Sequence, residues 1–316
     1  MSDILKAVLI VIISIVGIYL AYNIAFAFFF VGFCFKRENV EKKISKDGEP
    51  VPYLPSDRLW YEGIDKERIT IQSKDKLTLV GYLIKNNSNK LAILSHGYRG
   101  RAYSTTKQAK MFYELGYNVL LVNNRAHDES QGHFFSMGIL EREDLNRWIK
   151  KMVKRNPDYE IVLYGVSMGA HVTLRTLTKY KIDKNVLCAI VDCPYLTLYG
   201  QISHLLVSFK TGTIPPLVIT IASGITSLFL RFSIFSSIRR KINQIDVPLL
   251  LIHGTSDTFV PYKNSVKIYN LLTNHIYKEL QLFEGSDHRA SINDNPEKYK
   301  EITENFLNKF VKWESN

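Results

Sequence analysis

Residues 160–170 read EIVLYGVSMGA, an apolar run followed by a serine between two glycines. Residues 160–164 have the length and composition of a strand buried on both faces, and residues 170–179 have the apolar spacing of a helix. A G-x-S-x-G sequence between a strand and a helix predicts a sharp, strained turn that presents the serine hydroxyl, here that of Ser167. The two glycines would let the strand and the helix pack closely. This stretch therefore indicates an α/β fold with a nucleophilic serine.

An uncharged segment runs from Ala7 to Phe35 and consists mainly of Ile, Val, Leu, Phe and Ala. About 20 such residues are enough for a helix to span a bilayer. A cleaved signal peptide is the alternative, but its apolar region has about 7–15 residues and ends at a small-x-small site, and no such site precedes Lys36. We therefore predict one retained transmembrane anchor over residues 1–35.

The charges beside this segment bear on the side of the membrane that holds the rest of the chain. Basic residues follow it at Lys36, Arg37, Lys42, Lys43 and Lys46. By the positive-inside rule they favour a cytoplasmic domain, although large domains also translocate against such charge. The side of the membrane therefore stays open.

Composition excludes several classes of protein. The net charge is +11, but the lysines are dispersed and no basic helix accompanies them, so we expect no nucleic acid partner. A basic, solvated surface near anionic lipid headgroups fits the charge better. The three cysteines, at 34, 188 and 193, are poorly placed to bridge one another, and no C-x-x-C or histidine cluster suggests a metal. We expect no cofactor and no metal ion, and the sequence leaves the oligomeric state open.

The order of patterns along the chain predicts a doubly wound, mostly parallel sheet. A polar, proline-bearing linker over residues 36–66 precedes one large domain over residues 67–316. An antiparallel strand pair is expected first, at 68–73 and 77–85. Short apolar strands follow at 91–95, 118–123, 160–164, 187–192, 249–253 and 279–283, and helical patterns occur at 103–115, 140–155, 170–180, 263–272 and 296–312. In such sheets the site lies beyond the carboxyl ends of the strands.

At one of these strand ends stands His96-Gly97-Tyr98-Arg99-Gly100. Here the chain resembles the α/β-hydrolase superfamily, whose H-G-x-x-G loop donates a backbone N–H to an oxyanion hole. The resemblance implies that the N–H groups of Tyr98 and Met168 would stabilise a negatively charged oxygen, since Met168 follows the nucleophile. The resemblance covers residues 67–312 and implies the α/β-hydrolase fold.

The resemblance also implies an acid and a base. The stretch 248–261, PLLLIHGTSDTFVP, is similar to the strand and turn that carry the family's acid, here Asp257, and FEGSDH at 283–288 ends on the expected base, His288. The order Ser167, Asp257, His288 is that of the family. The base would take the serine proton, and the acid would hold the imidazole in its tautomer.

Several neighbouring residues are alternatives for these roles. Asp192 ends another strand and is the rival acid, while Asp287 is interpreted as a loop-orienting residue. His253 is interpreted as a buried turn residue rather than a base. Its H-x-x-x-D spacing to Asp257 is interpreted as a coincidence of the loop.

The stretch 122–132, VNNRAHDESQG, resembles the family's D-x-R-[GA]-H-G-x-S-x-G loop but departs from it twice. Asn124 stands where aspartate is usual, and Asp128 stands where glycine is usual. Aspartate enters the left-handed region more readily than most residues, so we expect the fold to tolerate Asp128. Arg125 and His127 are expected to brace loops below the site rather than to take part in catalysis.

An insertion of about fifty residues over 195–245 separates two predicted strands, far more than the usual loop of about 2–6 residues. Its middle, residues 214–230, is uncharged and apolar. A second membrane span would put Ser167 and His288 on opposite sides of the bilayer, so we predict an apolar cap over the site that covers an acyl-binding pocket and can lie against lipid. A purely structural cap is the alternative.

Together these features predict a membrane-anchored serine hydrolase that cleaves carboxylic esters with a lipophilic or acyl group. Thioesters, including acylated proteins, and peptides cleaved in the manner of prolyl oligopeptidases are alternatives within the same chemistry. A non-catalytic scaffold is the alternative from another class. The complete order of oxyanion loop, nucleophile, acid and base disfavours the scaffold. The expected partners are a small-molecule or lipid-like acyl substrate and membrane lipid.

Overall fold

The computed structural model describes residues 3–37, 55–208, 215–273 and 275–311. Its centre is one eight-stranded sheet with the strand order β1-β2-β4-β3-β5-β6-β7-β8. β1 and β2 pair antiparallel, β2 pairs antiparallel with β4, and all later neighbours are parallel. The strands are β1 (Glu67–Gln72), β2 (Thr78–Ile84), β3 (Lys90–Ser95), β4 (Asn118–Val122), β5 (Glu160–Val166), β6 (Val186–Asp192), β7 (Leu249–Gly254) and β8 (Lys278–Phe283). The predicted fold class is confirmed.

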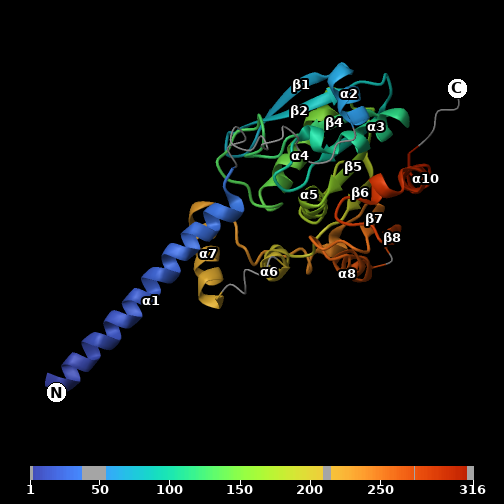
Figure 1. Cartoon of the computed structure of the whole chain (residues 1–316). Helices are drawn as coiled ribbons and strands as arrows, with labels where there is room; N and C mark the ends of the chain where they lie inside the picture. The colour runs from blue at the N-terminus through green and yellow to red at the C-terminus, as the bar shows by residue number, and fades with distance from the viewer. Residues whose placement is uncertain (1–2, 38–54, 209–214, 274, 312–316) are drawn as a thin grey trace.

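Helices cover both faces of this sheet (Figure 1). The helices of the domain are α2 (Pro55–Gly63), α3 (Thr106–Glu114), α4 (Glu141–Arg155), α5 (Met168–Leu177), α8 (Lys263–Leu271), α9 (Ser291–Asp294) and α10 (Pro296–Leu307). Buried side chains of α4, α5 and α8 form one core with the sheet, and buried side chains of α3 and α10 form a second core. The central strands β3, β4, β5, β6 and β7 are buried on both faces, which explains their nearly continuous apolar sequences.

The predicted linker contains folded structure within its described residues. α2 lies within it, and the ring of Trp60 packs against that of Tyr113 with centroids 5.8 Å apart. Residues 38–54 of the predicted linker lie outside the described residues. The sequence did not predict α2 because the helix is short and ends in a glycine. Among its described side chains, only the large apolar rings of Trp60 and Tyr61 pack against the domain.

The N-terminal segment forms a single helix, α1 (Asp3–Phe35), which is long and apolar enough to cross a membrane. All side chains over residues 3–22 are exposed, whereas Asn23, Ala27, Phe30, Val31 and Phe35 are buried against the rest of the protein. Figure 1 shows the first part projecting as a rod and the second part lying beside α7. The predicted boundary at residue 35 therefore falls at the end of the packed part, about three turns after α1 reaches the domain.

The insertion over residues 195–245 is partly helical and contains α6 (Leu198–Ser208), α7 (Pro216–Phe229) and a short 3-10 helix, η3 (Ile242–Gln244). An isolated bridge between Thr197 and Ser237 closes its base. α7 has 14 residues, fewer than a membrane span needs. Its buried face packs with the end of α1 in a third apolar cluster, and its last side chains, Leu228 and Phe229, are 79% and 71% exposed.

Candidate active site

Ser167 stands between the end of β5 and the start of α5 with φ 57° and ψ −116°, a strained conformation for a residue with a side chain. The flanking glycines are required by contact. A Cβ on Gly165 would lie 2.3 Å from the carbonyl oxygen of Gly169, and a Cβ on Gly169 would lie 2.0 Å from that of Ser95. The turn therefore exists only because the helix can approach the strands this closely, as the sequence predicted.

The structure brings the three predicted triad residues together. His288 lies in the loop after β8, and its Nε2 is 3.0 Å from Oγ of Ser167. Its Nδ1 is 2.7 Å from Oδ2 of Asp257, which lies in the loop after β7. The two ring nitrogens thus contact a hydroxyl on one side and a carboxylate on the other. With Nδ1 protonated, Nε2 is free to accept the hydroxyl proton.

Asp257 is buried and strongly hydrogen-bonded. Its Oδ1 accepts the backbone N–H groups of Phe259 and Val260 at 2.9 and 2.7 Å, and its Oδ2 faces His253 and His288. Burial alone would raise the pKa of Asp257, but these hydrogen bonds outweigh it and lower the pKa to about 2. The carboxylate is therefore ionised at neutral pH, as a residue that supports an imidazolium must be.

His253 has a closer relation to this carboxylate than the sequence suggested. It is the second-last residue of β7 and is fully buried, with Nε2 3.1 Å from Oδ2 of Asp257 and Nδ1 2.7 Å from the hydroxyl of Ser265. Its burial agrees with the prediction, but it lies in the strand and not in the turn. The interpretation of the H-x-x-x-D spacing as a coincidence was wrong, because the strand-to-loop turn puts the two side chains in contact. The spacing itself was the available signal.

Asp192, the rival acid, has no hydrogen bond to His288 among the described interactions. Its Oδ2 accepts hydrogen bonds from the hydroxyls of Tyr299 and Tyr164 at 2.8 and 3.3 Å, while its Oδ1 is buried without a partner in the described chain. Burial raises the pKa of Asp192. Its backbone carbonyl accepts the N–H of Ser167, so the residue supports the turn through its main chain.

The two proposed oxyanion donors lie beside the nucleophile. Met168 is the first residue of α5, so its N–H belongs to the helix terminus that has no intrahelical acceptor. The loop 96–100, called the oxyanion loop below, passes directly over Ser167: a Cβ on Gly97 would lie 3.3 Å from its Cβ and 3.8 Å from its Oγ. Tyr98 follows in this loop.

Two departures from the family's arginine-containing loop are explained by contacts. Asn124 donates its backbone N–H to Nε2 of His96 at 3.1 Å and its side-chain amide to the His96 carbonyl at 3.3 Å, so it braces the oxyanion loop. Asp128 has φ 45° and so occupies the left-handed region, as expected for a residue at a glycine position.

Other expectations for bracing residues agree with the structure. Arg125 is buried and forms two hydrogen bonds to Asp144, at 2.7 and 2.8 Å, and two more to Asp75. The carboxylate of Asp287 accepts the N–H groups of Thr258 and His288, so it ties two loops of the site together.

Within the described residues, one group could offer three ligands to a metal ion: Cys193, Asp257 and His288. Asp257 and His288 already pair with each other, and burial raises the pKa of the Cys193 thiol, which opposes the thiolate form that metals bind. All three cysteines are free. These donors suit a proton-transfer site better than a metal centre.

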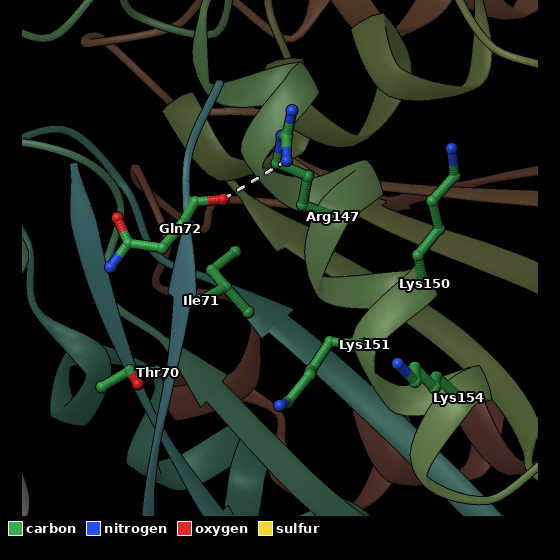
Figure 2. A pocket seen from close by; sticks show the side chains of 7 residues that line it. All are labelled: Thr70, Ile71, Gln72, Arg147, Lys150, Lys151 and Lys154. Atoms are coloured by element: carbon green, nitrogen blue, oxygen red, sulfur yellow. Dashed lines mark hydrogen bonds between the residues drawn. The ribbon is translucent and has the colours of Figure 1, made fainter. Parts of the chain in front are cut away.

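A hollow elsewhere on the surface is unrelated to this site. Figure 2 shows it between β1 and α4, lined by Thr70, Ile71, Gln72, Arg147, Lys150, Lys151 and Lys154. Its one drawn hydrogen bond runs from Arg147 to the carbonyl of Gln72 at 3.4 Å. Because its lining includes no acid, imidazole or thiol, it offers no groups for the chemistry considered above.

Two family models match the chain. One is described as serine aminopeptidase, S33, and matches residues 86–215; the other is described as the prolyl oligopeptidase family and matches residues 223–313. Together they extend from just before β3 to beyond α10, and the gap between them falls inside the cap.

Individual proteins are also similar. The uncharacterized protein YqkD of Bacillus subtilis is 25% identical over 78% of this chain and 81% of its own length. The lysophosphatidylserine lipase ABHD12 of Danio rerio is 24% identical over 51% of this chain and 41% of its own length. The solved structure of the Pyrococcus furiosus esterase Pf2001 has a TM-score of 0.66 and 25% identity, covering 83% of this chain and 97% of that chain.

Proposed function

Because the chain belongs to the α/β-hydrolase superfamily, we propose that it is a serine hydrolase that cleaves carboxylic esters with lipophilic acyl groups. The observation that carries the proposal is the continuous hydrogen-bonded series from Ser167 through His288 to Asp257. A nucleophile, a base and an orienting carboxylate in this geometry support acyl transfer through a covalent intermediate.

The proposed reaction uses each group in turn. Oγ of Ser167 attacks the ester carbonyl while Nε2 of His288 takes its proton, and the ionised Asp257 stabilises the resulting imidazolium. The tetrahedral oxyanion accepts hydrogen bonds from the N–H groups of Tyr98 and Met168. The carbon–oxygen bond to the alcohol then breaks as His288 protonates the leaving oxygen. Water repeats the sequence on the acyl-enzyme, which releases the acid and restores the serine.

Esters are favoured over other acyl substrates by the surroundings of the site. The side chain of Met168 belongs to the apolar cluster that joins α1, α7 and the loop containing Phe135 and Met137, so the chemistry adjoins a large apolar region. The esterase and lipase among the similar proteins act on esters by their names. Thioesters would follow the same steps. The two matching family models are named for peptidases, so cleavage of peptides is the second candidate.

We also propose that α1 anchors the enzyme in a membrane. The exposed part over residues 3–22 has about the length needed to span the hydrocarbon core. A signal sequence would pass the same test of length and composition, but the burial of Ala27, Phe30, Val31 and Phe35 against the domain supports a helix that stays attached. Leu228 and Phe229 would then face the lipid interface beside it.

A substrate panel tests the activity. Purified full-length protein in detergent is assayed with p-nitrophenyl esters of increasing acyl length, with matched thioesters and with aminoacyl anilides, using Ser167→Ala as the control. We expect kcat/KM to be highest on esters and to rise with acyl length, by up to about 0.8 kcal/mol of binding for each methylene. Higher kcat/KM on anilides would replace the ester proposal by the peptidase one. Labelling of Ser167 by a fluorophosphonate separates any hydrolase from a non-catalytic scaffold.

Depth-dependent quenching tests the membrane arrangement. In a Cys34→Ser background, because Cys34 is free and partly exposed, an NBD fluorophore is attached to Leu228→Cys or, as a control in the lysine-lined hollow between β1 and α4, to Lys154→Cys, and the protein is reconstituted into vesicles. Doxyl-labelled lipids should quench the label at position 228 and leave that at 154 bright. Equal quenching at the two positions would show that α7 does not contact lipid as proposed.

A further inference from the structure

The C-terminal end of α1 has carbonyl groups that its own helix cannot satisfy. The last turn of any helix leaves such acceptors, and near a bilayer an unpaired carbonyl is costly. Here the carbonyl of Phe33 accepts a hydrogen bond from the guanidinium of Arg99 at 2.8 Å. The carbonyl of Cys34 accepts one from the hydroxyl of Tyr98 at 3.3 Å, and the carbonyl of Phe35 accepts one from the N–H of Phe135 at 3.0 Å.

Two of these three donors are side chains of the oxyanion loop. The Arg99 guanidinium lies 5.8 Å from the ring of Phe33 and 4.9 Å from the ring of Tyr98, so it sits between the helix and the loop. Its positive charge at a helix C-terminus also complements the helix dipole. α1 has no basic residue in its own last turn, and Arg99 adds to the positive charge of Lys36 and Arg37, which follow the helix.

The same loop residue is held in an unfavourable backbone conformation. Arg99 has φ 52°, which costs energy in a residue with a side chain and persists only where surrounding contacts fix it. The contacts to Phe33 and Cys34 are such constraints. The ring of Tyr98 is held from the other side by Phe135, with centroids 5.5 Å apart.

We propose that the last turn of α1 positions the oxyanion loop, with Arg99 and the Tyr98 hydroxyl as the positioning groups. The inference rests on the proposed role of the Tyr98 N–H in the oxyanion hole. It makes α1 part of the catalytic apparatus as well as an anchor. Neither side chain contacts the reacting atoms in this scheme; each acts through the backbone to which it belongs.

The test uses full-length protein in detergent with p-nitrophenyl acetate, a substrate too small to depend on the apolar region. Arg99→Met removes the hydrogen bonds and the charge while keeping much of the side chain. Because loss of a whole oxyanion donor costs about 10²–10³ in kcat, we expect displacement of one to lower kcat by about 10- to 100-fold with KM changed less than about threefold. Tyr98→Phe, which keeps the ring, should lower kcat by about two- to fivefold, since the bond it removes is longer.

Two variants separate positioning from general damage. Arg99→Lys keeps a cation that can reach the Phe33 carbonyl and should recover part of the lost kcat. Arg101→Met changes a neighbouring arginine whose guanidinium bonds to Tyr103 rather than to α1, and should leave kcat within about twofold. Unfolding midpoints of all variants are compared in the same detergent.

A boronic acid inhibitor gives a readout that a structural defect alone would not move. Its serine adduct is anionic and tetrahedral, so its inhibition constant should weaken in Arg99→Met by the same factor as kcat/KM. An unchanged kcat and inhibition constant in folded Arg99→Met, with Ser167→Ala inactive, would overturn this inference and leave the proposed function standing. Activity retained in Ser167→Ala would instead overturn the proposed function.

Discussion

Asp192 ends β6, and Asp257 follows β7, the neighbouring strand, yet their surroundings differ in the donors they offer. Asp257 receives two backbone N–H groups and lies against two imidazoles, so its charged form is favoured and its pKa falls to about 2. Among the residues that the structure describes, Asp192 receives hydrogen bonds only from tyrosine hydroxyls, and burial raises its pKa. The comparison teaches that position at a strand end is not enough to identify a catalytic acid. The number and kind of hydrogen-bond donors decide which carboxylate stays charged.

The largest expected effect sets the scale for comparing the two aspartates. Ser167→Ala and His288→Ala should each lower kcat by about 10³–10⁶-fold, because either change removes the nucleophile or its base. The two losses should be similar, and the double variant should be little worse, since the residues act as a unit. Esterase kinetics and circular dichroism on the same samples check activity and folding. Full activity in folded Ser167→Ala would show that Ser167 is not the nucleophile. The two aspartates could then not be compared as the acid of this triad.

Replacing each aspartate by asparagine tests directly which of the two carboxylates acts as the acid of the triad. Asp257→Asn should lower kcat by about 10⁴-fold, because the amide favours the wrong imidazole tautomer and cannot stabilise its cation. Asp192→Asn should lower kcat by less than about tenfold and instead reduce the free energy of unfolding by about 1–3 kcal/mol, through its buried tyrosine network. Denaturant titration measures the second effect. A greater loss of kcat from Asp192→Asn would show that Asp192 is the acid.

The pH dependence of kcat/KM provides a second comparison of the two aspartates. Because the base accepts a proton only in its neutral form, kcat/KM should rise with pH through a single step between about pH 4.5 and 8.5 and then level off. Asp257, with its pKa of about 2, is ionised throughout this range, so it adds no second step above about pH 4. The profile is measured from pH 4.5 to 8.5 in wild type and in Asp192→Asn. If the step disappears in Asp192→Asn, the group that titrates is Asp192 rather than the base.

The smallest expected effect concerns His253, the second imidazole beside Asp257. His253→Phe keeps a planar ring but removes the hydrogen bonds of both ring nitrogens, including the one to the carboxylate, which should lower kcat about tenfold, the size of one hydrogen bond to a charged group. Ser265→Ala removes only the partner of the other ring nitrogen and should cost less than about threefold. If the two variants have equal kcat, His253 supports Asp257 only by packing.

Much of the fold was predictable because the signals were local. The apolar run and the glycines around Ser167 predict a strand, a turn and a helix within residues 160–179, and most of the parallel strands are continuous apolar stretches of strand length. The left-handed conformation at Asp128 was also predictable, since few residue types tolerate it.

What could not be predicted depends on contacts between segments far apart in the sequence. The apolar pattern of α1 is nearly the same in its exposed and its packed parts, because lipid and protein interiors select the same residues. Only Asn23 differs, and its buried amide bonds within the helix to the Tyr19 carbonyl. Likewise, the contact between α1 and the oxyanion loop joins residues separated by 64 and 66 positions, and no periodicity reports such a distance.

The junction between α1 and the domain also determines how the enzyme would move at a membrane. A flexible tether of about 30 residues would let a domain wander over roughly 30 Å. In this chain the helix runs without interruption into the domain, and Arg37 is already hydrogen-bonded to the backbone of Ser130 at 2.9 Å before residues 38–54 begin. The packed end of α1 therefore joins the helix to the domain directly. With α1 across a bilayer, the rigid helix would hold Ser167 at a fixed distance from the membrane surface. The enzyme would then meet its substrate by lateral diffusion in the plane of the membrane.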